Sequence, residues 1–399
     1  MTKPLLVYAN VPFCNSKCHF CDWVVQVPTR ELRLTPETPG RTRYLDAVAE
    51  QVAAHAPGLR ADGYEPRIVY WGGGTASILD IDEIRRLHGA ITAELDLSGV
   101  VEATIEGSPE SLSRAKLDVL RSLGFNRISI GVQSFADDRL RMIGRSHSAD
   151  EAVRAVGEAA EAGFDNINID LIVGFPDEDL AEVEDTVRRA LTLPVNHFSV
   201  YPYRASPGTV LRKQVDRGNT SLNVERQLRA YRLAADLLTG AGHPEYAMSY
   251  FGGPHCLSDE AYYQLKMDWI GFGAGANSLV RQRYLATTKG RLARFNDNPT
   301  AFDVDVPAGS DNLVKHFLAQ ALTTREGVDA RLFQERTGVS LRRACERPDV
   351  HAYLERMAKY GDLVVDGTGI RLTPETMART YVALSWIDLP TPEVIADTA

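Results

Sequence analysis

Three cysteines near the start of the chain carry the clearest chemical signature. They lie in the sequence PFCNSKCHFCDW, which places Cys14, Cys18 and Cys21 at spacings of four and three residues. Thiolates are soft ligands that favour zinc or an iron–sulfur cluster. In a loop that follows a strand, this spacing lets all three thiolates wrap one face of a [4Fe–4S] cluster. One iron then has no protein ligand and is open to an external molecule.

Two other interpretations of the cysteines stay open on spacing alone. A zinc site would need a fourth ligand, for which His19 is the nearest candidate. Alternatively, the three thiols are reduced and have no role. The chain has five cysteines, an odd number that makes a secreted disulfide framework a poor fit. We therefore expect a cytoplasmic protein with reduced thiols.

Composition excludes several classes of function. The chain has 399 residues, of which 44% are hydrophobic and 24% charged, enough for one large domain and a smaller one. Its net charge is −9, and like charges do not gather in long runs, so no nucleic-acid partner is expected. The first residues show no apolar signal region or cleavage site, so no signal sequence is expected, and no apolar run reaches the ~18 residues of a membrane span. No membrane association is predicted.

The elements that must position the cysteines follow a repeating pattern. Short apolar runs alternate with stretches of helical period from about residue 4 to residue 285. The six predicted strands are LLVYANV, RIVYWGG, EATIEGS, RISIGVQ, NINIDLIVG and HFSVYPY. Six such units predict an α/β fold in which a parallel sheet curls into a partial (β/α)6 barrel. Functional residues are then expected at the carboxyl ends of the strands.

The pattern also predicts a division of the chain into domains. Residues 1–285 form the barrel with its extension, 286–310 form a polar linker, and 311–399 form a small C-terminal helical domain with a winged end. The winged end is predicted from LVVDGTGIRLTP, in which a Gly-containing turn joins two runs that favour strands.

With the cysteines and strand ends in register, the chain resembles radical S-adenosylmethionine (SAM) proteins of the group that contains the oxygen-independent coproporphyrinogen III oxidases. The resemblance is carried by YANVPFCNSKCHFC, WGGGT, TIEGSP, GVQSF, NIDLIVGFP, YPYRASPGT and GFGAGANS. It implies a radical SAM barrel, a [4Fe–4S] cluster on the three cysteines, and SAM on the open iron. It also implies an external electron donor such as flavodoxin or ferredoxin.

The resemblance assigns further residues to a first SAM molecule. The glycine turn after the second predicted strand, which includes Gly73 and Gly74, lets backbone groups approach a ligand closely. By resemblance this turn meets the amino and carboxylate groups of SAM, and Glu106 and Tyr8 lie beside it. Glu106 stands in an apolar run, where a carboxylate is costly unless it is paired.

Members of this group hold a second SAM molecule, and the matching residues are present here. The group places a Gln, an Arg and an Asp along three strand ends, and the matching residues here are Gln133, Arg145 and Asp170. An aspartate can accept from ribose hydroxyls and an arginine can pair with a carboxylate, so the set suits SAM. Further positions assigned to the cofactors are Phe20, Gly74, Thr75 and Arg204.

The chain departs from two branches of the group. The oxidases carry a further cysteine two residues after the third ligand, where this chain has Asp22 and then Trp23. The haem-chaperone branch carries an HNxxYW motif, where this chain has Asp259 and Glu260 in place of His and Asn. His255 and Cys256 are the nearby residues that could replace the missing histidine.

These departures favour the third branch, the class C radical SAM methyltransferases and the related cyclopropane-forming enzymes. We therefore expect transfer of a methyl or methylene unit from a second SAM to an sp² carbon of a small or peptide-borne aromatic natural product. Candidates for a catalytic base are Tyr203, Asp259 and Glu260. The alternatives are a haem-binding chaperone and decarboxylation of coproporphyrinogen III.

Overall fold

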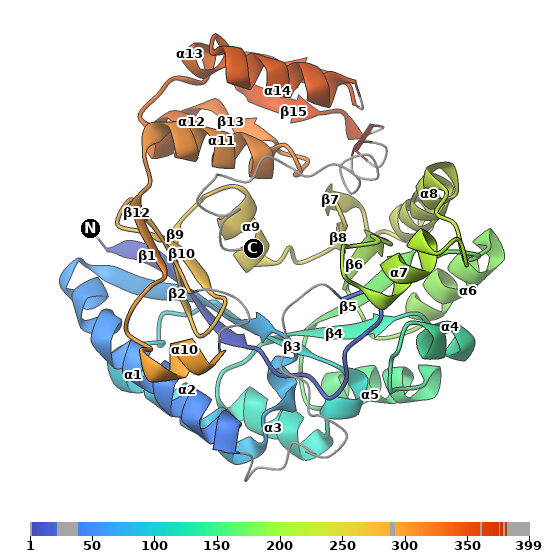
Figure 1. Ribbon diagram of the computed structural model, residues 1–399, viewed down its shortest axis with the longest axis horizontal. Coiled ribbons are helices and arrows are strands. Elements are labelled where there is room, and N and C mark those ends of the chain that lie inside the picture. The colour runs from blue at the N-terminus through green and yellow to red at the C-terminus, as the bar shows by residue number, and fades with distance from the viewer. Residues whose placement is uncertain are drawn as a thin grey trace. The chain divides into compact units, whose positions relative to one another are not determined.

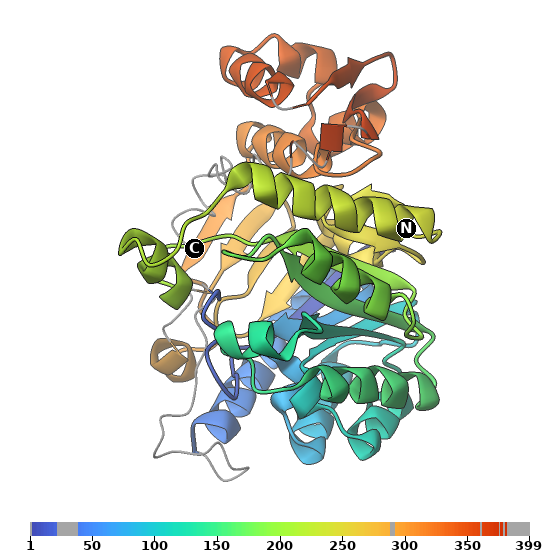
Figure 2. The same ribbon diagram turned by 90° about the vertical axis from the view of Figure 1, so that its right-hand side faces the viewer.

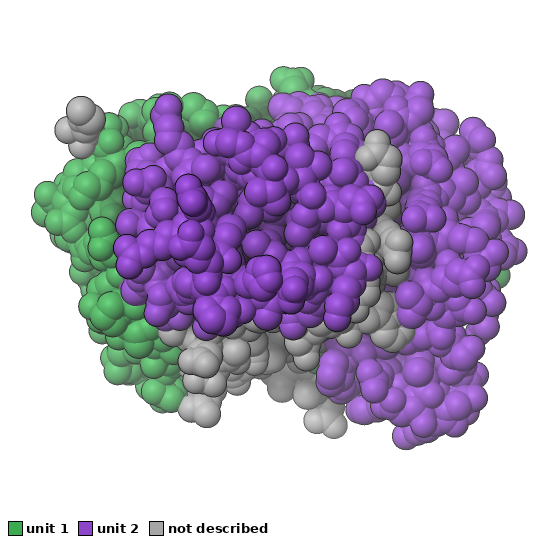
Figure 3. Space-filling view, turned by 90° about the horizontal axis from the view of Figure 1, so that it is seen from above, with its two compact units in different colours: residues 1–169, 267–307, 398–399 green, residues 170–266, 308–397 purple. Residues whose placement is uncertain are grey.

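The computed structural model describes residues 2–21, 39–287, 292–359, 361–374, 376, 377 and 380. The chain divides into two compact units, shown in two colours in Figure 3. Unit 1 takes residues 1–169, 267–307 and 398–399, and unit 2 takes residues 170–266 and 308–397. Asp22 and Trp23, on which part of the functional prediction rests, lie outside the described residues.

Unit 1 is built on four parallel strands that pair in chain order (Figure 1). They are β1 (Lys3–Val11), β2 (Tyr64–Gly73), β3 (Glu102–Gly107) and β4 (Arg127–Gln133). Every residue of β4 is buried, as in parallel sheets that are covered on both faces. Because the strands are parallel and adjacent, their carboxyl ends meet at one edge of the sheet.

Helices connect these strands and cover the outer face of the sheet (Figures 1 and 2). They are α1 (Pro39–Ala61), α2 (Ile81–Glu94), α3 (Arg114–Ser122) and α5 (Ala149–Glu161). Reciprocal hydrogen bonds start α2 at Asp80 and Glu83, and start α5 at Ser148 and Glu151. Shortly after α5, Gly163 adopts a positive φ of 89°, which suits the end of a helix.

Unit 1 also contains strands that the sequence did not predict. On the other side of β1, β9 (Asp268–Phe272) runs parallel to it. An antiparallel series follows, made of β10 (Asn277–Val280), β11 (Arg283–Ala286) and β12 (Val304–Pro307). These strands are only four or five residues long, so they gave no signal in the sequence.

Unit 2 begins within a strand. Two more predicted strands are confirmed as β5 (Asn166–Val173), which crosses the boundary between the units, and β6 (His197–Pro202). In unit 2, β6 pairs antiparallel with β8 (Tyr250–Gly252), and β8 pairs antiparallel with β7 (Glu245–Ala247). The helices here are α6 (Leu180–Ala190), α7 (Val210–Asp216), α8 (Val224–Gly240) and α9 (Leu257–Tyr263).

The last part of unit 2 is mainly helical. It contains α11 (Ser310–Ala321), α12 (Ala330–Thr337), α13 (Leu341–Cys345) and α14 (Pro348–Ala358). The predicted hairpin is confirmed: β14 (Leu363–Val365) pairs antiparallel with β15 (Gly369–Leu372), which also pairs with β13 (Val328–Asp329). Residues 381–399 of the predicted C-terminal domain lie outside the described residues. Among the helices that the structure describes, none is both long and apolar enough to span a membrane.

Candidate functional site

The three cysteines follow the carboxyl end of β1 in unit 1. Cys14, Cys18 and Cys21 are all partly buried free thiols. The pKa of Cys14 is raised to about 11, mainly by burial and to a lesser extent by Cys21 and Cys18, although the hydrogen bond with Thr75 opposes the shift. Sγ of Cys14 lies 3.5 Å from Oγ1 of Thr75, which stands two residues after the end of β2. The thiols therefore share one environment at the edge of the sheet.

His19 does not join the thiols as a ligand in this structure. Its Nδ1 lies 2.7 Å from the carbonyl of Met142, and its backbone N–H donates to the carbonyl of Ile143. Among the described residues, no three His, Cys, Asp or Glu side chains gather as they would around a single metal ion. A cubane cluster makes a different demand, because each thiolate binds a different iron atom.

The glycine turn after β2 forms a cradle beside Cys14. Gly73 adopts a φ of 115°, which side chains with a Cβ rarely adopt. A Cβ on Gly74 would lie 2.6 Å from the carbonyl oxygen of Phe13 and 3.0 Å from Sγ of Cys14. Only glycine therefore lets the backbone pass this close to the cysteine loop.

Polar side chains at the ends of β1, β2 and β3 are tied to this turn. The carboxylate of Glu106 accepts hydrogen bonds from the hydroxyl of Tyr70 at 2.6 Å and from the backbone N–H of Gly73 at 3.1 Å. The hydroxyl of Tyr8 donates to Oδ1 of Asn10 at 3.0 Å, and the rings of Tyr8 and Tyr70 stack at 6.0 Å. Burial and the charge of Glu106 raise the pKa of Tyr8 well above its usual value, so this tyrosine stays neutral.

Two residues predicted for a second SAM lie in the same unit. Gln133 ends β4 with a φ of 70°, an uncommon conformation for a residue other than glycine. Nη1 of Arg145 lies 3.4 Å from Sγ of Cys18, and its Nη2 donates to the carbonyl of Gly131 at 2.6 Å. Phe20, between Cys18 and Cys21, is half-buried. We call this group the cysteine edge: Tyr8, Cys14, Cys18, Phe20, Cys21, Gly73, Gly74, Thr75, Glu106, Gln133 and Arg145.

The remaining predicted residues belong to unit 2. Asp170 lies half-buried in β5, and Arg204 is exposed after β6. Tyr203 is buried, its hydroxyl has no hydrogen-bond partner among the described residues, and burial raises its pKa to about 12. Asp170 and Arg204 are thus not brought together with Gln133 and Arg145 within one unit.

A second polar site lies in unit 2, at a pocket of about 110 Å³. It contains two predicted residues, Asp259 and Glu260 of α9, but also residues that the sequence reasoning missed. The residues of this site, which we call the histidine pocket, are Tyr246, His255, Asp259, Glu260, Tyr263 and Arg325. Tyr246 and Arg325 gave no signal in the sequence, because neither matches a motif.

His255 is held from two sides in the histidine pocket. Its ring stacks on that of Tyr246, with the ring centres 3.8 Å apart and the planes 12° apart. Its Nδ1 lies 3.1 Å from the carboxylate of Glu260, which also accepts a hydrogen bond from Lys266 at 2.9 Å. Burial acts to raise the pKa of Glu260, but Lys266 and His255 lower it below its usual value. The carboxylate therefore stays ionised and fixes the orientation of the imidazole.

Cys256 is not presented in the same way as its neighbour. It is buried, with 1% of its surface exposed, and its Sγ lies 3.1 Å from the hydroxyl of Ser258. Of the two residues suggested as replacements for the missing histidine, only His255 therefore presents its side chain to the pocket.

Comparisons with known proteins decide the family. The sequence pattern of the Radical SAM superfamily matches residues 11–190, and that of the HemN C-terminal domain matches residues 310–378. The haem chaperone HemW of Escherichia coli is 31% identical over 296 residues, which cover 73% of this chain and 75% of HemW. The chain belongs to the HemN and HemW group of radical SAM proteins.

Two coproporphyrinogen III oxidases of the HemN and HemW group are similar along most of the chain. The oxygen-independent enzyme of Salmonella typhimurium is 25% identical and covers 93% of this chain and 82% of its own length. The structure of the Escherichia coli oxidase HemN covers 97% of this chain and 91% of its own, with a TM-score of 0.79 at 22% identity. The predicted α/β radical SAM fold, with its C-terminal helical domain, is therefore confirmed.

Membership in the HemN and HemW group also gives the cofactors. The chain is a radical SAM protein, so it uses a [4Fe–4S] cluster and SAM, and an electron donor must reduce the cluster. The residues at the cysteine edge fit such a group: three partly buried thiols and a glycine cradle that a single Cβ would fill.

The prediction of a class C methyltransferase or cyclopropane-forming enzyme is wrong. The relatives that match most of the chain are HemW chaperones and HemN oxidases. That prediction excluded both branches on substitutions at a few positions, such as Asp22 and Asp259, while the similarity extends over about three quarters of the chain or more. The base role given to Tyr203, Asp259 and Glu260 belonged to that reaction and lapses with it, as does the aromatic natural-product substrate.

Proposed function

We propose that this protein is a haem-binding member of the HemN and HemW group, similar in function to a haem chaperone. The observation that carries the proposal is the similarity to HemW over about three quarters of both chains, together with a histidine placed to bind a metal. Haem or a related porphyrin then replaces the aromatic substrate expected from the sequence. The family shares one fold among several activities, so the site has to support the assignment.

His255 is the proposed ligand of the haem iron. A histidine that binds a metal commonly has its other ring nitrogen held by a carboxylate, which fixes the ring and raises its basicity. Glu260 acts in this way on Nδ1, and no other polar contact of His255 is found in the described residues, so its Nε2 is available for iron. His255 stands four residues before Asp259, the position that matches the histidine of HNxxYW. The proposed ligand is thus four residues from the expected position.

The other residues of the histidine pocket suit part of a porphyrin. Tyr246 and Tyr263 supply aromatic surface, and Arg325 supplies a cation for a propionate group. At about 110 Å³, the pocket is too small to enclose a porphyrin, since pockets for ligands of drug size have volumes of ~300 Å³ or more. We therefore expect the haem to rest against the pocket, with the iron toward His255.

At the cysteine edge, we propose that Cys14, Cys18 and Cys21 hold the cluster. The amino and carboxylate groups of SAM then meet the turn at Gly73 and Gly74, beside Tyr8 and Glu106. In unit 1 we assign Phe20, Gly74, Thr75, Gln133 and Arg145 to a second SAM, and the roles of Asp170 and Arg204 stay predictions. The cluster supplies an electron that cleaves SAM, and flavodoxin or ferredoxin is the proposed donor in the cytoplasm, where thiols stay reduced. The domain limits 1–285, 286–310 and 311–399 remain proposals.

A haem titration tests the function. Purified protein is titrated with ferric haem, and with metal-free protoporphyrin as a control that offers the same ring without iron. We expect a shift of the Soret band that saturates at one haem per chain, and much weaker binding of the metal-free ring. If haem binds without saturation, or no more tightly than the metal-free ring, the proposal fails.

Decarboxylation of coproporphyrinogen III is the second candidate. It is favoured by the similarity to HemN along nearly the whole chain. The reduced protein with SAM is incubated with coproporphyrinogen III, and released carbon dioxide is measured. Release at one or more turnovers per chain would establish this activity in place of the chaperone function. Its absence, in protein shown to cleave SAM, would remove it.

A further inference from the structure

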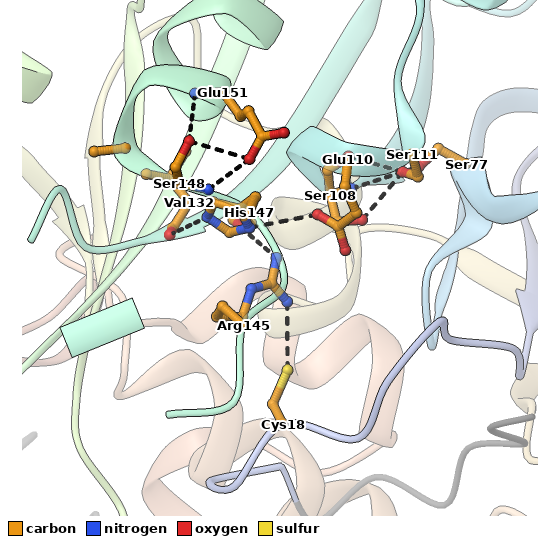
Figure 4. A network of polar contacts seen from close by, with 12 residues as sticks. Cys18, Ser77, Ser108, Glu110, Ser111, Val132, Arg145, His147, Ser148 and Glu151 are labelled. Carbon is orange, nitrogen blue, oxygen red and sulfur yellow. Dashed lines mark hydrogen bonds and ion pairs between the residues drawn. The ribbon is translucent and has the colours of Figure 1, made fainter. Parts of the chain in front are cut away.

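A group of charged side chains extends from the cysteine loop into the interior of unit 1. Figure 4 shows the guanidinium of Arg145 between Cys18 on one side and the pair Glu110 and His147 on the other. Arg145 joins the cysteine loop to β4, because Nη1 lies 3.4 Å from Sγ of Cys18 and Nη2 donates to the carbonyl of Gly131. The position of this one side chain thus affects both the cysteine loop and the end of β4.

Glu110 and His147 form an ion pair behind Arg145. The side chain of His147 is fully buried, and its Nδ1 lies 3.4 Å from the carboxylate of Glu110. Its Nε2 lies 3.1 Å from the carbonyl oxygen of Val132 in β4. Nδ1 makes no hydrogen bond within the described residues, so its contact with Glu110 is electrostatic.

Glu110 is the negative charge in this group. Burial acts to raise its pKa, but the neighbouring His147 and the charge of Arg145 lower it to about 2. Nε of Arg145 is buried and has no acceptor among the described residues. A cation that is partly buried is costly without a counter-ion, so the carboxylate of Glu110 stabilises Arg145 in its position.

We propose that Glu110 and His147 are positioning residues that hold Arg145 against Cys18 and thereby help to set the reduction potential of the cluster. The potential of an iron–sulfur cluster depends on hydrogen bonds to its sulfur ligands and on nearby charge. An N–H donor and a positive charge beside Cys18 favour the reduced cluster, which carries one more electron. The inference rests on the proposed role of Cys18 as a cluster ligand.

The direction in which Glu110→Gln shifts the reduction potential of the cluster distinguishes this mechanism from a simple charge effect. Glu110→Gln removes a negative charge, and a direct field effect alone would make the potential more positive. If Glu110 acts by holding Arg145, the loss of the contact with Cys18 outweighs that effect and makes the potential more negative. Arg145→Ala shifts the potential in the same negative direction.

The experiment is a redox titration of the anaerobic, cluster-loaded protein, monitored by electron paramagnetic resonance. It compares the wild type, Glu110→Gln, Arg145→Ala and the double variant. We expect a negative shift in each single variant, and a double variant that matches Arg145→Ala, because Glu110 acts through Arg145. Glu151→Gln is the matched control: it removes one negative charge near His147, while glutamine still serves in the capping box that starts α5. Its potential should equal that of the wild type.

A positive shift in Glu110→Gln, or shifts that simply add in the double variant, would overturn the inference. If Glu110→Gln does not fold, His147→Gln tests the same point, since it removes the charge of the pair but keeps a donor for Val132. An unchanged potential there would also overturn it. The iron content of Cys18→Ala separates the two proposals: a retained cluster refutes the role of Cys18, whereas a lost cluster leaves only the positioning role to be judged by the titration.

Discussion

The cysteine edge and the histidine pocket use polar groups in different ways. At the cysteine edge the polar side chains are tied to the backbone at strand ends: Glu106 accepts from Gly73, and Arg145 donates to Gly131. In the histidine pocket, His255 is tied to another side chain and rests on an aromatic ring. The geometry of a site that is bonded to strand ends is set by the fold. The geometry of a site that is built from side chains can change when a few residues are replaced.

This difference means that the cysteine edge depends on the order of the strands, whereas the histidine pocket depends on a few side chains. The cysteine edge combines the ends of β1 to β4 with the loops that follow them, so the order of the strands fixes which residues meet. The histidine pocket combines β7, α9 and Arg325, which lies after α11. In the histidine pocket, the residue that binds iron can change its position in the chain by a few residues, as we propose for His255, without any change in the sheet.

Loss of the cluster is the largest effect that we expect. Cys14→Ala, Cys18→Ala and Cys21→Ala should each remove essentially all cluster iron and all SAM cleavage, because thiolate ligands attach the cluster. Iron content and the brown absorbance of anaerobically purified protein measure this. Cys256→Ala and Cys345→Ala are the controls and should keep full iron. Stoichiometric iron in any of the first three variants would break the assignment of the cysteine edge.

The glycine cradle gives the next largest effect. Gly73→Ala places a Cβ against Asn10 at a φ of 115°, and should destabilise the protein by about 3 kcal/mol and abolish measurable SAM binding. Gly89→Ala is the matched control, because Gly89 lies in α2 with open space around it. That change should stabilise the protein by about 0.5–1 kcal/mol. Thermal unfolding measures the stability of both variants, and calorimetry measures their binding of SAM. Wild-type affinity for SAM in Gly73→Ala would rule out close contact between the glycine turn and SAM.

The difference between the two sites also shows which features of the structure could be predicted from the sequence. The positions of β1 to β6 were predictable, because apolar runs alternate with helical periods and turns. The cysteine edge was predictable because chain order places Cys14, Gly73 and Glu106 at the ends of neighbouring strands. The placement of Glu110 and His147 near Arg145 was not, since Glu110 lies in a short 3-10 helix after β3, His147 precedes α5, and neither matches a motif.

The functional prediction failed where it depended on few residues. The replacement of two motif residues by Asp259 and Glu260 argued against haem, because sequence alone cannot show that His255 stacks on Tyr246 and pairs with Glu260. The short strands β9 to β12 were missed for a related reason: their partners are set by the whole sheet rather than by local alternation.

The buried carboxylate of Glu245 should make the stability of the protein depend on pH, a smaller effect than those above. In unit 2, burial raises the pKa of Glu245 to about 7 from 4.5, although a hydrogen bond from Tyr231 opposes the shift. The folded state then holds a proton that the unfolded state releases, so this contribution to stability is present below about pH 4.5 and is lost as the pH rises to about 7. The loss is at most about 3 kcal/mol.

Glu245→Gln tests this, because the amide oxygen can still accept from Tyr231 but does not titrate. The difference in unfolding temperature between the wild type and the variant should change between pH 5 and 8, with the wild type losing stability relative to the variant. A constant difference over this range would show that Glu245 does not titrate as its burial predicts.

The most direct test of the account is the haem affinity of His255→Ala. His351→Ala is the matched control, since His351 is also an exposed histidine beside a glutamate, at 3.4 Å from Glu355, but lies on α14. Both variants are purified without oxygen, their cluster iron is measured, and they are titrated with ferric haem. We predict that His255→Ala binds haem roughly 100-fold more weakly or worse, as expected for loss of an interaction of about 3 kcal/mol. This variant should keep its cluster. His351→Ala should match the wild type in haem affinity and in cluster iron. Wild-type haem affinity in His255→Ala would contradict the central claim that this histidine binds the iron.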